Sequence, residues 1–235
     1  TEIGGEAYVR ANGFLFMAGV TGGEVHGQVT VPQKRSPTFL TKLGYDKQIN
    51  SDLRFRLTGS LYATSRSVNN TLYSGDRAGS RYYDVMENTT STEDANPWSA
   101  SIQPKLSSKV TAIVINPFVK YDGFEFFGNA EQVKGRSAAE TVDRTWHQYV
   151  GEGLYRFAEN KLYLGGRYNY VKGAYLGMPN DVSVNRTQMG GGWFVTPTIL
   201  LKSEYMIQNY NDFPSTDIRS GGKIKGYMIE GTVSF

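Results

Sequence analysis

Apolar and polar residues alternate along much of the chain, and the clearest case is the segment 53–63, Leu-Arg-Phe-Arg-Leu-Thr-Gly-Ser-Leu-Tyr-Ala. Leu53 and Phe55 fall on one face of an extended strand while Arg54 and Arg56 fall on the other, because successive side chains of a strand point in opposite directions. At about 3.3 Å per residue, about ten such residues have the length that a tilted strand needs to cross the hydrocarbon layer of a membrane. The pattern predicts a strand of membrane-spanning length.

The same alternation recurs and predicts about ten strands in this chain. The clear ones are expected at 39–49, 53–66, 110–121, 124–135, 145–157, 162–172, 188–196, 199–210 and 224–235, with a weaker one at 7–19.

The connections between these strands alternate in length. Tight turns are expected at 50–52, 122–123, 158–161 and 196–198, and Asp122-Gly123 is a strong two-residue hairpin signal. Long connections, rich in Gly, Asn, Asp, Ser and Arg, are expected near 20–38, 67–109, 136–144, 173–187 and 211–223. Short turns at one rim and long loops at the other are typical of bacterial outer-membrane barrels. A soluble β-sandwich, the alternative, has no reason to gather its long loops at one end.

We therefore predict an all-β fold, a transmembrane antiparallel up-and-down β-barrel of about ten strands that forms a single domain over 1–235. The expected location is the bacterial outer membrane, with the loops near 20–38, 67–109, 173–187 and 211–223 extracellular. Ten strands leave a lumen mostly filled by side chains, so either this is a narrow barrel or the chain is the C-terminal part of a larger one.

Composition adds to this picture. Aromatic residues make up 13% of the chain and glycine contributes 27 positions, an excess that β-barrels use for interfacial belts and tight strand contacts. No stretch approaches the ~18 to 20 apolar residues of a membrane-spanning helix. Pro117 lacks an N–H to donate, so we expect it close to a rim or at a bulge.

The closing strand carries an expected assembly signal. It places Tyr227, Ile229, Gly231, Val233 and Phe235 on one face and ends on an aromatic residue. This ending resembles the C-terminal signal by which insertion machinery recognises outer-membrane barrels. The expected partners are that machinery, outer-membrane lipid and lipopolysaccharide, with a second copy or another envelope protein left open.

Charge and cysteine content exclude several classes of site. The net charge of +3 is spread along the chain, which argues against nucleic acid as a partner. The chain has no cysteine, so disulfides and thiolate metal sites are excluded, and we expect neither a metal nor a cofactor. The first residues, 1–5, show no basic and then apolar leader.

From about Pro37 onward the sequence resembles porin-type barrels of the Bacteroidota, with a general similarity to the phosphate-selective porin O and P family. The resemblance is carried by the segments 43–48 (Leu-Gly-Tyr-Asp-Lys-Gln) and 192–205 (Gly-Trp-Phe-Val-Thr-Pro-Thr-Ile-Leu-Leu-Lys-Ser-Glu-Tyr), and by the closing strand. It implies a porin-type barrel. Relatives of this type are expected to have longer chains and about 16 to 18 strands.

If the apolar faces touch lipid, the charged residues on the opposite faces line the pore. These are Lys42, Asp46, Arg54, Arg56, Lys120, Glu125, Glu131, Glu152, Arg156, Arg167, Lys202, Glu204 and Glu230. Seven are basic and six acidic, whereas strong anion selectivity calls for a ring of one sign. Arg54 and Arg56 either form an anion-attracting patch or pair with Asp46 or Glu230 on neighbouring strands.

Aromatic residues are also candidates for the lumen. Tyr62, Tyr163 and Tyr210 are expected to point inward, where they either stack on sugar rings or fill space. The loop at 67–109 is the longest, and its aromatic content predicts an ordered loop that narrows the mouth or contacts a partner. Its aromatic and apolar members are Tyr73, Tyr82, Tyr83, Met86 and Trp98. Its acids Asp84, Glu87, Glu93 and Asp94 lack the spacing of a known Ca²⁺ loop, so we expect solvated charge.

We expect no enzymatic activity. The chain has two histidines, His26 and His147, and parity places His147 with Tyr149 on the lipid-facing side, where it cannot complete a hydrolase site. The glycines at 190–192 run directly into Trp193 and not into a helix, so they do not form a phosphate-binding loop. The leading hypothesis is a weakly selective porin for small hydrophilic solutes or ions, and the alternative is a closed barrel that serves as a structural or accessory subunit of an envelope complex.

Overall fold

The computed structural model describes residues 2–24, 35–68, 70–73, 86–87, 89–92 and 99–234. It contains eleven strands: β1 (Glu2–Ala11), β2 (Phe14–Glu24), β3 (Thr38–Gln48), β4 (Leu53–Thr64), β5 (Lys109–Tyr121), β6 (Phe124–Arg136), β7 (Arg144–Phe157), β8 (Leu162–Gly173), β9 (Val182–Thr196), β10 (Ile199–Asn211) and β11 (Lys223–Val233). In the part of the chain that the structure describes, no helix is long and apolar enough to cross a membrane.

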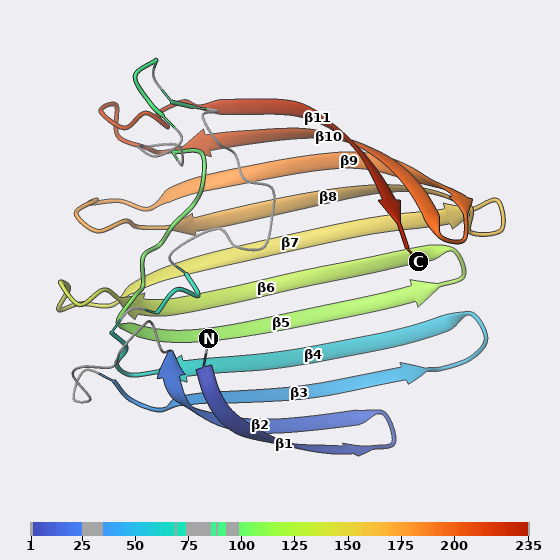
Figure 1. Ribbon diagram of the computed structural model, residues 1–235, viewed down its shortest axis with the longest axis horizontal. Helices are drawn as coiled ribbons and strands as arrows, with labels where there is room; N and C mark the ends of the chain where they lie inside the picture. The colour runs from blue at the N-terminus through green and yellow to red at the C-terminus, as the bar shows by residue number, and fades with distance from the viewer. Residues whose placement is uncertain are drawn as a thin grey trace.

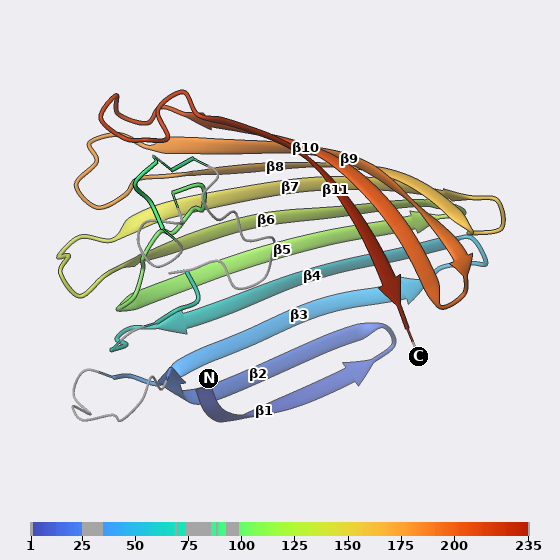
Figure 2. The ribbon, with the colours of Figure 1, turned by 45° about the horizontal axis from the view of Figure 1, so that its top comes forward.

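The strands form one sheet in which each strand pairs antiparallel with its sequence neighbours (Figure 1). The predicted all-β, up-and-down topology is confirmed, and the single sheet contradicts a two-sheet sandwich. β1 and β11 form the two edges of the described sheet, and both ends curl toward the same side (Figures 1 and 2).

The prediction of one weak strand at 7–19 was wrong. Asn12 and Gly13 have φ values of 50° and 88°, as a two-residue hairpin turn requires, and β1 and β2 pair on either side of them. The described residues therefore form eleven strands where ten were expected. Two loop boundaries also differ, because β2 continues to Glu24 and β9 begins at Val182, inside segments that were expected to be loops.

Connection lengths alternate as predicted. Short turns join β1 to β2, β3 to β4, β5 to β6, β7 to β8 and β9 to β10 at one rim, and longer segments join the remaining pairs at the opposite rim (Figure 1). The connection from Thr64 to Lys109 is the longest of them. We call these ends the short-turn rim and the long-loop rim.

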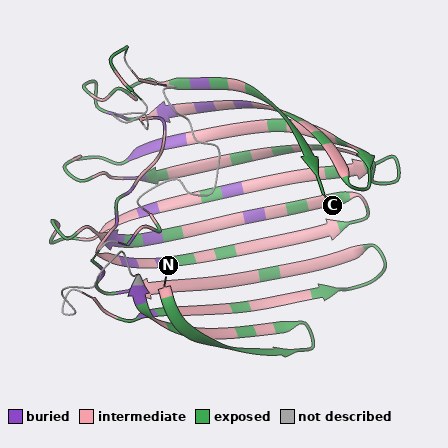
Figure 3. Ribbon diagram, viewed as in Figure 1, coloured by how far each residue is buried: buried purple, intermediate pink, exposed green. Residues whose placement is uncertain are grey.

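The two faces of the sheet differ in chemistry and in what covers them. The outer face carries large apolar side chains that are open to the surroundings, such as Leu43 (63% exposed), Leu164 (62%) and Ile229 (84%). Buried positions concentrate toward the long-loop rim, and the strands otherwise alternate between exposed and partly buried residues (Figure 3). An apolar surface this extended is suited to hydrocarbon and not to water.

The core lies on the opposite, inner face, close to the long-loop rim. Val110, Val133, Trp146 and Met206 project from four strands and pack with Leu106 from the β4–β5 connection. These inner positions are apolar, so a water-filled lumen there would leave them uncovered. The connection supplies the cover: its described part, drawn in green, runs along the concave side of the sheet near the long-loop rim (Figure 1).

Pro117 lies inside β5, four residues from the end of the strand, and not at a bulge. The β5–β6 pairing is continuous except at Asn116 and Pro117, where no partners are formed. The side chain of Asn116 donates to the carbonyl of Gly128 at 3.3 Å and to Oδ1 of Asn129 at 2.8 Å. A side-chain donor thus replaces backbone pairing at the proline.

Candidate pore lumen

All thirteen charged residues predicted to line a pore lie on the inner face. The register shows this directly, because Asp46 pairs with Arg56, Arg54 with Lys120, and Lys202 with Glu230 across neighbouring strands. Their positions follow from strict alternation, which carries each polar residue to the face opposite the apolar ones. Whether these side chains line an open pore remains a prediction.

Many of these charges neutralise one another across strands. Arg54 holds Asp46 with two contacts, from Nε to Oδ1 at 2.9 Å and from Nη2 to Oδ2 at 2.7 Å. Similar cross-strand ion pairs join Arg156 and Lys120 to Glu125 (3.0 and 3.8 Å), Arg167 to Glu152 (3.3 Å) and Lys202 to Glu230 (3.0 Å). Arg54 therefore pairs with Asp46, which was one of the two predicted alternatives. This ion pair argues against the other alternative, an anion-attracting patch of Arg54 and Arg56.

In the described part of the chain, four of the thirteen residues form no ion pair, and three of these four contact a neutral side chain. Arg56 lies over the ring of Phe118, with the guanidinium carbon 4.8 Å from its centroid. Glu131 accepts a hydrogen bond from the Tyr73 hydroxyl, and Glu204 accepts one from Gln188 at 2.7 Å. Among the described residues, no ion pair involves Lys42, Arg56, Glu131 or Glu204.

A hydrogen-bonded row of polar side chains crosses the inner face from β8 to β10. Arg167 donates to Asn169 at 3.1 Å, Asn169 donates to Gln188 at 3.3 Å, and Gln188 continues to Glu204. Arg186 lies beside this row and donates to Gln208 at 2.7 Å. The sequence prediction missed Arg186, because it placed the start of that strand at residue 188.

The β4–β5 connection is tied to the inner wall at both of its ends. Near its start, Tyr73 donates to Glu131 and Asn70 donates to the Tyr62 hydroxyl at 2.6 Å. Near its end, the Tyr210 hydroxyl donates to the carbonyl of Ala100. Burial raises the pKa of Tyr73, so its hydroxyl stays a donor to the carboxylate at ordinary pH. The described part of this loop therefore lies inside the curl of the sheet and is bonded to it. Whether the whole loop narrows the mouth or contacts a partner stays a prediction.

The three predicted inner tyrosines all lie on the inner face. Tyr62 donates to Glu2 at 2.7 Å, and Tyr210 serves the loop contact with Ala100. Tyr163 lies beneath Arg156, whose guanidinium carbon is 5.8 Å from the ring centroid. Each of the three tyrosines therefore contacts another residue of the protein.

Beneath the loop a space remains open between the inner wall and the connection. This cavity of about 520 Å³ is lined by Tyr73, Ala100 and Ile102 of the loop, and its wall includes Glu131, Arg167 and Arg186. A second cavity of about 840 Å³ lies on the other side of the same connection, near Lys105 and Arg219. The described part of the loop thus divides the space near the long-loop rim without filling it.

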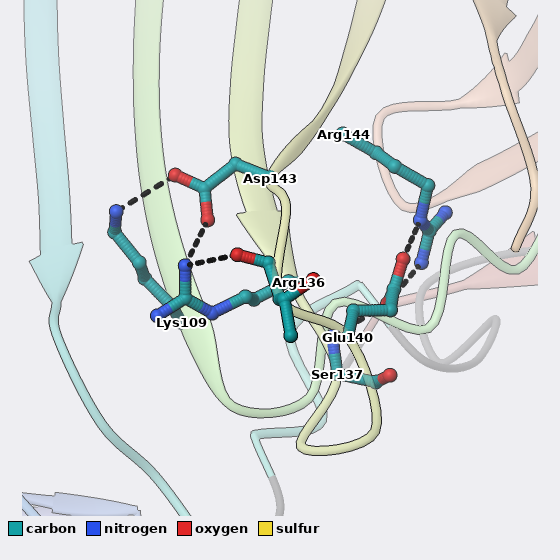
Figure 4. Close-up of polar contacts among 7 residues, drawn as sticks. Lys109, Arg136, Ser137, Glu140, Asp143 and Arg144 are labelled. Carbon is teal, nitrogen blue, oxygen red and sulfur yellow. Dashed lines mark hydrogen bonds and ion pairs between the residues drawn. The ribbon is translucent and has the colours of Figure 1, made fainter.

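A network of charges fixes the long-loop rim (Figure 4). Arg144 binds Glu140 and also donates to the carbonyls of Ala174 at 2.9 Å and Pro104 at 3.0 Å. It therefore joins three connections at one side chain. The hydrogen bond from Arg144 lowers the pKa of Glu140 to about 2, so this carboxylate stays charged through the physiological range.

Other predicted chemistry falls outside this lumen or outside the described residues. His147 lies on the outer face with its ring stacked parallel to Tyr149 at 6.3 Å, as parity predicted. Within the described residues, no group of three or more His, Cys, Asp or Glu side chains could hold a metal ion. His26, Tyr82, Tyr83, Asp84, Glu93, Asp94, Trp98 and Phe235 lie outside the described residues.

The described members of the assembly signal lie on the outer face of β11. Tyr227 is 82% exposed, Ile229 84% and Val233 63%. Their role in insertion remains a prediction.

No protein-family model matches the chain, and no curated protein sequence matches it. Solved structures do resemble it. The anion-selective porin from Comamonas acidovorans aligns with a TM-score of 0.63 and 12% identity, covering 98% of this chain and 58% of the porin. OmpT, an outer membrane protein of Vibrio cholerae, aligns with a TM-score of 0.54 and 14% identity, covering 97% of this chain and 62% of OmpT.

These likenesses establish the fold. The chain has the antiparallel up-and-down architecture of integral outer-membrane β-barrels, in agreement with the predicted location. It spans about three fifths of the length of these two solved structures.

Proposed function

We propose that this chain forms a porin-like channel of the outer membrane, through which small hydrophilic solutes or ions diffuse passively with weak selectivity. The observation that carries the proposal is the inner face. Charged and amide side chains line much of it, and the described part of a tethered loop crosses it next to the apolar core and leaves a cavity of about 520 Å³ beneath. A hydrophilic wall around a narrowed passage lets a solute exchange its water for protein contacts as it passes.

Weak selectivity is proposed because the inner charges mix both signs. Cross-strand ion pairs such as Arg167 with Glu152 leave little net field for a passing ion. The solved neighbour from Comamonas is named an anion-selective porin, which supports the channel part of the proposal. The mixed signs of charge on the inner wall favour no strong preference for phosphate.

The proposal assigns no catalytic activity to this chain. A barrel hydrolase needs a nucleophile, a base and an orienting group that converge on one point. His147, the described histidine, faces outward and stacks on Tyr149. Nine of the thirteen inner charges predicted to line the pore pair with one another across strands, which suits a passive wall.

Single-channel recording on the full-length protein in planar bilayers tests the proposal. We expect discrete conductance steps in symmetric KCl and a reversal potential close to zero in a tenfold KCl gradient. A folded protein that inserts but never opens discrete steps contradicts the channel and favours the structural or accessory subunit. A reversal potential near the anion or cation limit contradicts weak selectivity alone.

A further inference from the structure

The outer face carries charge of one sign. On the described outer positions of β3 to β11, every charged residue is basic. The acids of these strands all lie on the inner face. The outward cations are Lys47, Lys109, Lys134, Arg136, Lys172, Lys223 and Lys225. All except Lys47 lie within three residues of the long-loop rim. A charge next to hydrocarbon is unfavourable unless a polar or charged group meets it, so this distribution needs a counterpart at that level of the membrane.

The densest group is formed by Lys109, Lys134 and Arg136 on β5 and β6, which we call the rim cation cluster. Lys109 and Arg136 are cross-strand partners, and Lys134 lies two residues further along the same face. Asp143 accepts from Lys109 Nζ at 2.7 Å and from Arg136 Nη1 at 2.9 Å (Figure 4). Three positive charges therefore surround one negative charge. The Lys109 hydrogen bond, aided by the charges of Arg136 and Lys134, holds the pKa of Asp143 below its usual range.

The cluster lies at the boundary of the apolar band. Ile113 (49% exposed) lies four residues beyond Lys109 on the same face of β5, and Tyr149 (50%) lies on β7, next to β6, as the partner of Ala130. Exposed tyrosines of this kind mark the level where hydrocarbon gives way to headgroups. The cations lie on the loop side of that level, and Lys109 and Arg136 keep about a third of their side-chain surface open (34% and 35%).

We propose that the rim cation cluster binds the phosphate group of a lipid headgroup in the membrane leaflet at the long-loop rim. The phosphate oxygens accept from Lys134 and from the guanidinium and ammonium groups that Asp143 orients, and the acyl chains lie along the apolar face below. Arginine and lysine together suit phosphate, since one offers a planar fork and the other a mobile point charge. A soluble protein partner fits less well, because the surface adjoining the cluster faces hydrocarbon.

The test uses the full-length protein folded in a zwitterionic detergent and native mass spectrometry of the bound lipid. The probes are lipid A carrying two phosphates and the same lipid after enzymatic dephosphorylation. The variant is K134Q/R136Q, and K47Q is the matched control because Lys47 is an outward lysine at the opposite rim. A third arm adds inorganic phosphate at the concentration of the lipid.

We expect the wild type and K47Q to retain the phosphorylated lipid in preference to the dephosphorylated one. Each cation near an anionic surface contributes about fivefold in affinity, so K134Q/R136Q should bind on the order of 30-fold more weakly. Equal retention of the two lipids, or unchanged retention by the variant, overturns the proposal. Displacement by inorganic phosphate at equal concentration also overturns it, because the site would then be specific for the free anion. If the double variant does not fold, K134Q alone should show the fivefold loss.

Discussion

At the scale of single residues, the β5–β6 wall shows how a barrel strand accommodates a proline. The ring of Pro117 occupies the space beside Gly128, where a Cβ would lie 2.8 Å from Pro117 Cγ. Asn116 then supplies the donor that the proline lacks. Proline, glycine and asparagine therefore act together, and replacing one of them should disturb the pairing of the two strands.

Gly128→Ala is expected to destabilise the protein by about 1–3 kcal/mol, because the added methyl group must displace the proline ring in a packed wall. Gly151 is the cross-strand partner of Gly128, and a Cβ there meets nothing within 4 Å. Gly151→Ala is therefore the matched control and should be nearly neutral. Urea unfolding in lipid vesicles measures the difference. Equal midpoints for the two variants would show that the proline contact is unimportant.

Glu140 makes the long-loop rim sensitive to acid. Its pKa is lowered by Arg144 to about 2, from an ordinary value of 4.5. A lowered pKa means that the unfolded segment binds the proton more readily, so the stabilisation is complete above about pH 4.5 and is lost as the pH falls toward 2. The protection of the amides across 137–144, taken relative to their intrinsic exchange rate at each pH, should fall in that window. Glu140→Gln should exchange faster already at pH 7 and show little further change in acid, whereas Glu159→Gln, 87% exposed at the opposite rim, should behave as the wild type.

At the scale of elements, strands and turns could be predicted wherever one face is apolar and the other polar. Where both faces have the same character, the alternation fades. The inner positions Val182 and Val184 are apolar because they pack in the core beneath the loop, and this obscured the start of β9. The Asn12-Gly13 turn was visible in the sequence, but the weak alternation around it led to a single strand being predicted.

The inward path of the β4–β5 connection could be predicted only in outline. Aromatic content indicated an ordered loop, but its position depends on contacts such as Tyr210 with Ala100, which join residues 110 positions apart. No local pattern specifies such a pair. The apolar residues on the inner face, which include Val110 and Val133, also indicate that the connection covers this face. They can be recognised as one patch only after the strand register is known.

Releasing this loop should widen the proposed passage. Tyr210→Phe removes the donor to the buried carbonyl of Ala100, and an unsatisfied buried carbonyl costs about 1–3 kcal/mol. We expect larger and noisier single-channel currents than in the wild type. Tyr149→Phe, which alters an exposed tyrosine of the outer face, is the control and should leave the currents unchanged. Identical current traces for Tyr210→Phe and the wild type would show that the tether does not limit conduction.

At the scale of the whole molecule, the two faces of the sheet assign charge to different tasks. The inner face mixes acids and bases in cross-strand pairs, while the charged residues on the described outer positions of β3 to β11 are all basic and, apart from Lys47, lie near the long-loop rim. A lumen in which acids and bases are paired favours the passage of ions of either sign. Outer cations at one rim favour contact of that rim with anionic lipid headgroups. Both arrangements arise from one alternating pattern, since the same strand presents its odd and even residues to different surroundings.

The proposed weak selectivity includes a contribution from two inner acids that form no ion pair with the described residues. Glu131 and Glu204 are bonded to Tyr73 and Gln188, so neutralising them removes negative charge without breaking an ion pair in the described part of the chain. At about 7 Å from a passing ion in water, each charge changes the relative permeability roughly threefold, so E131Q/E204Q should shift the reversal potential clearly toward anions.

The charge-conserving swap K202E/E230K is the control for this shift, because it retains the ion pair and the net charge of the wall. It should leave the reversal potential unchanged. The shift in E131Q/E204Q should shrink in 1 M salt, where screening acts within about 3 Å. If the double neutralisation and the swap give the same reversal potential at low salt, these inner acids do not face the conducting path, and the selectivity of the channel must be determined elsewhere.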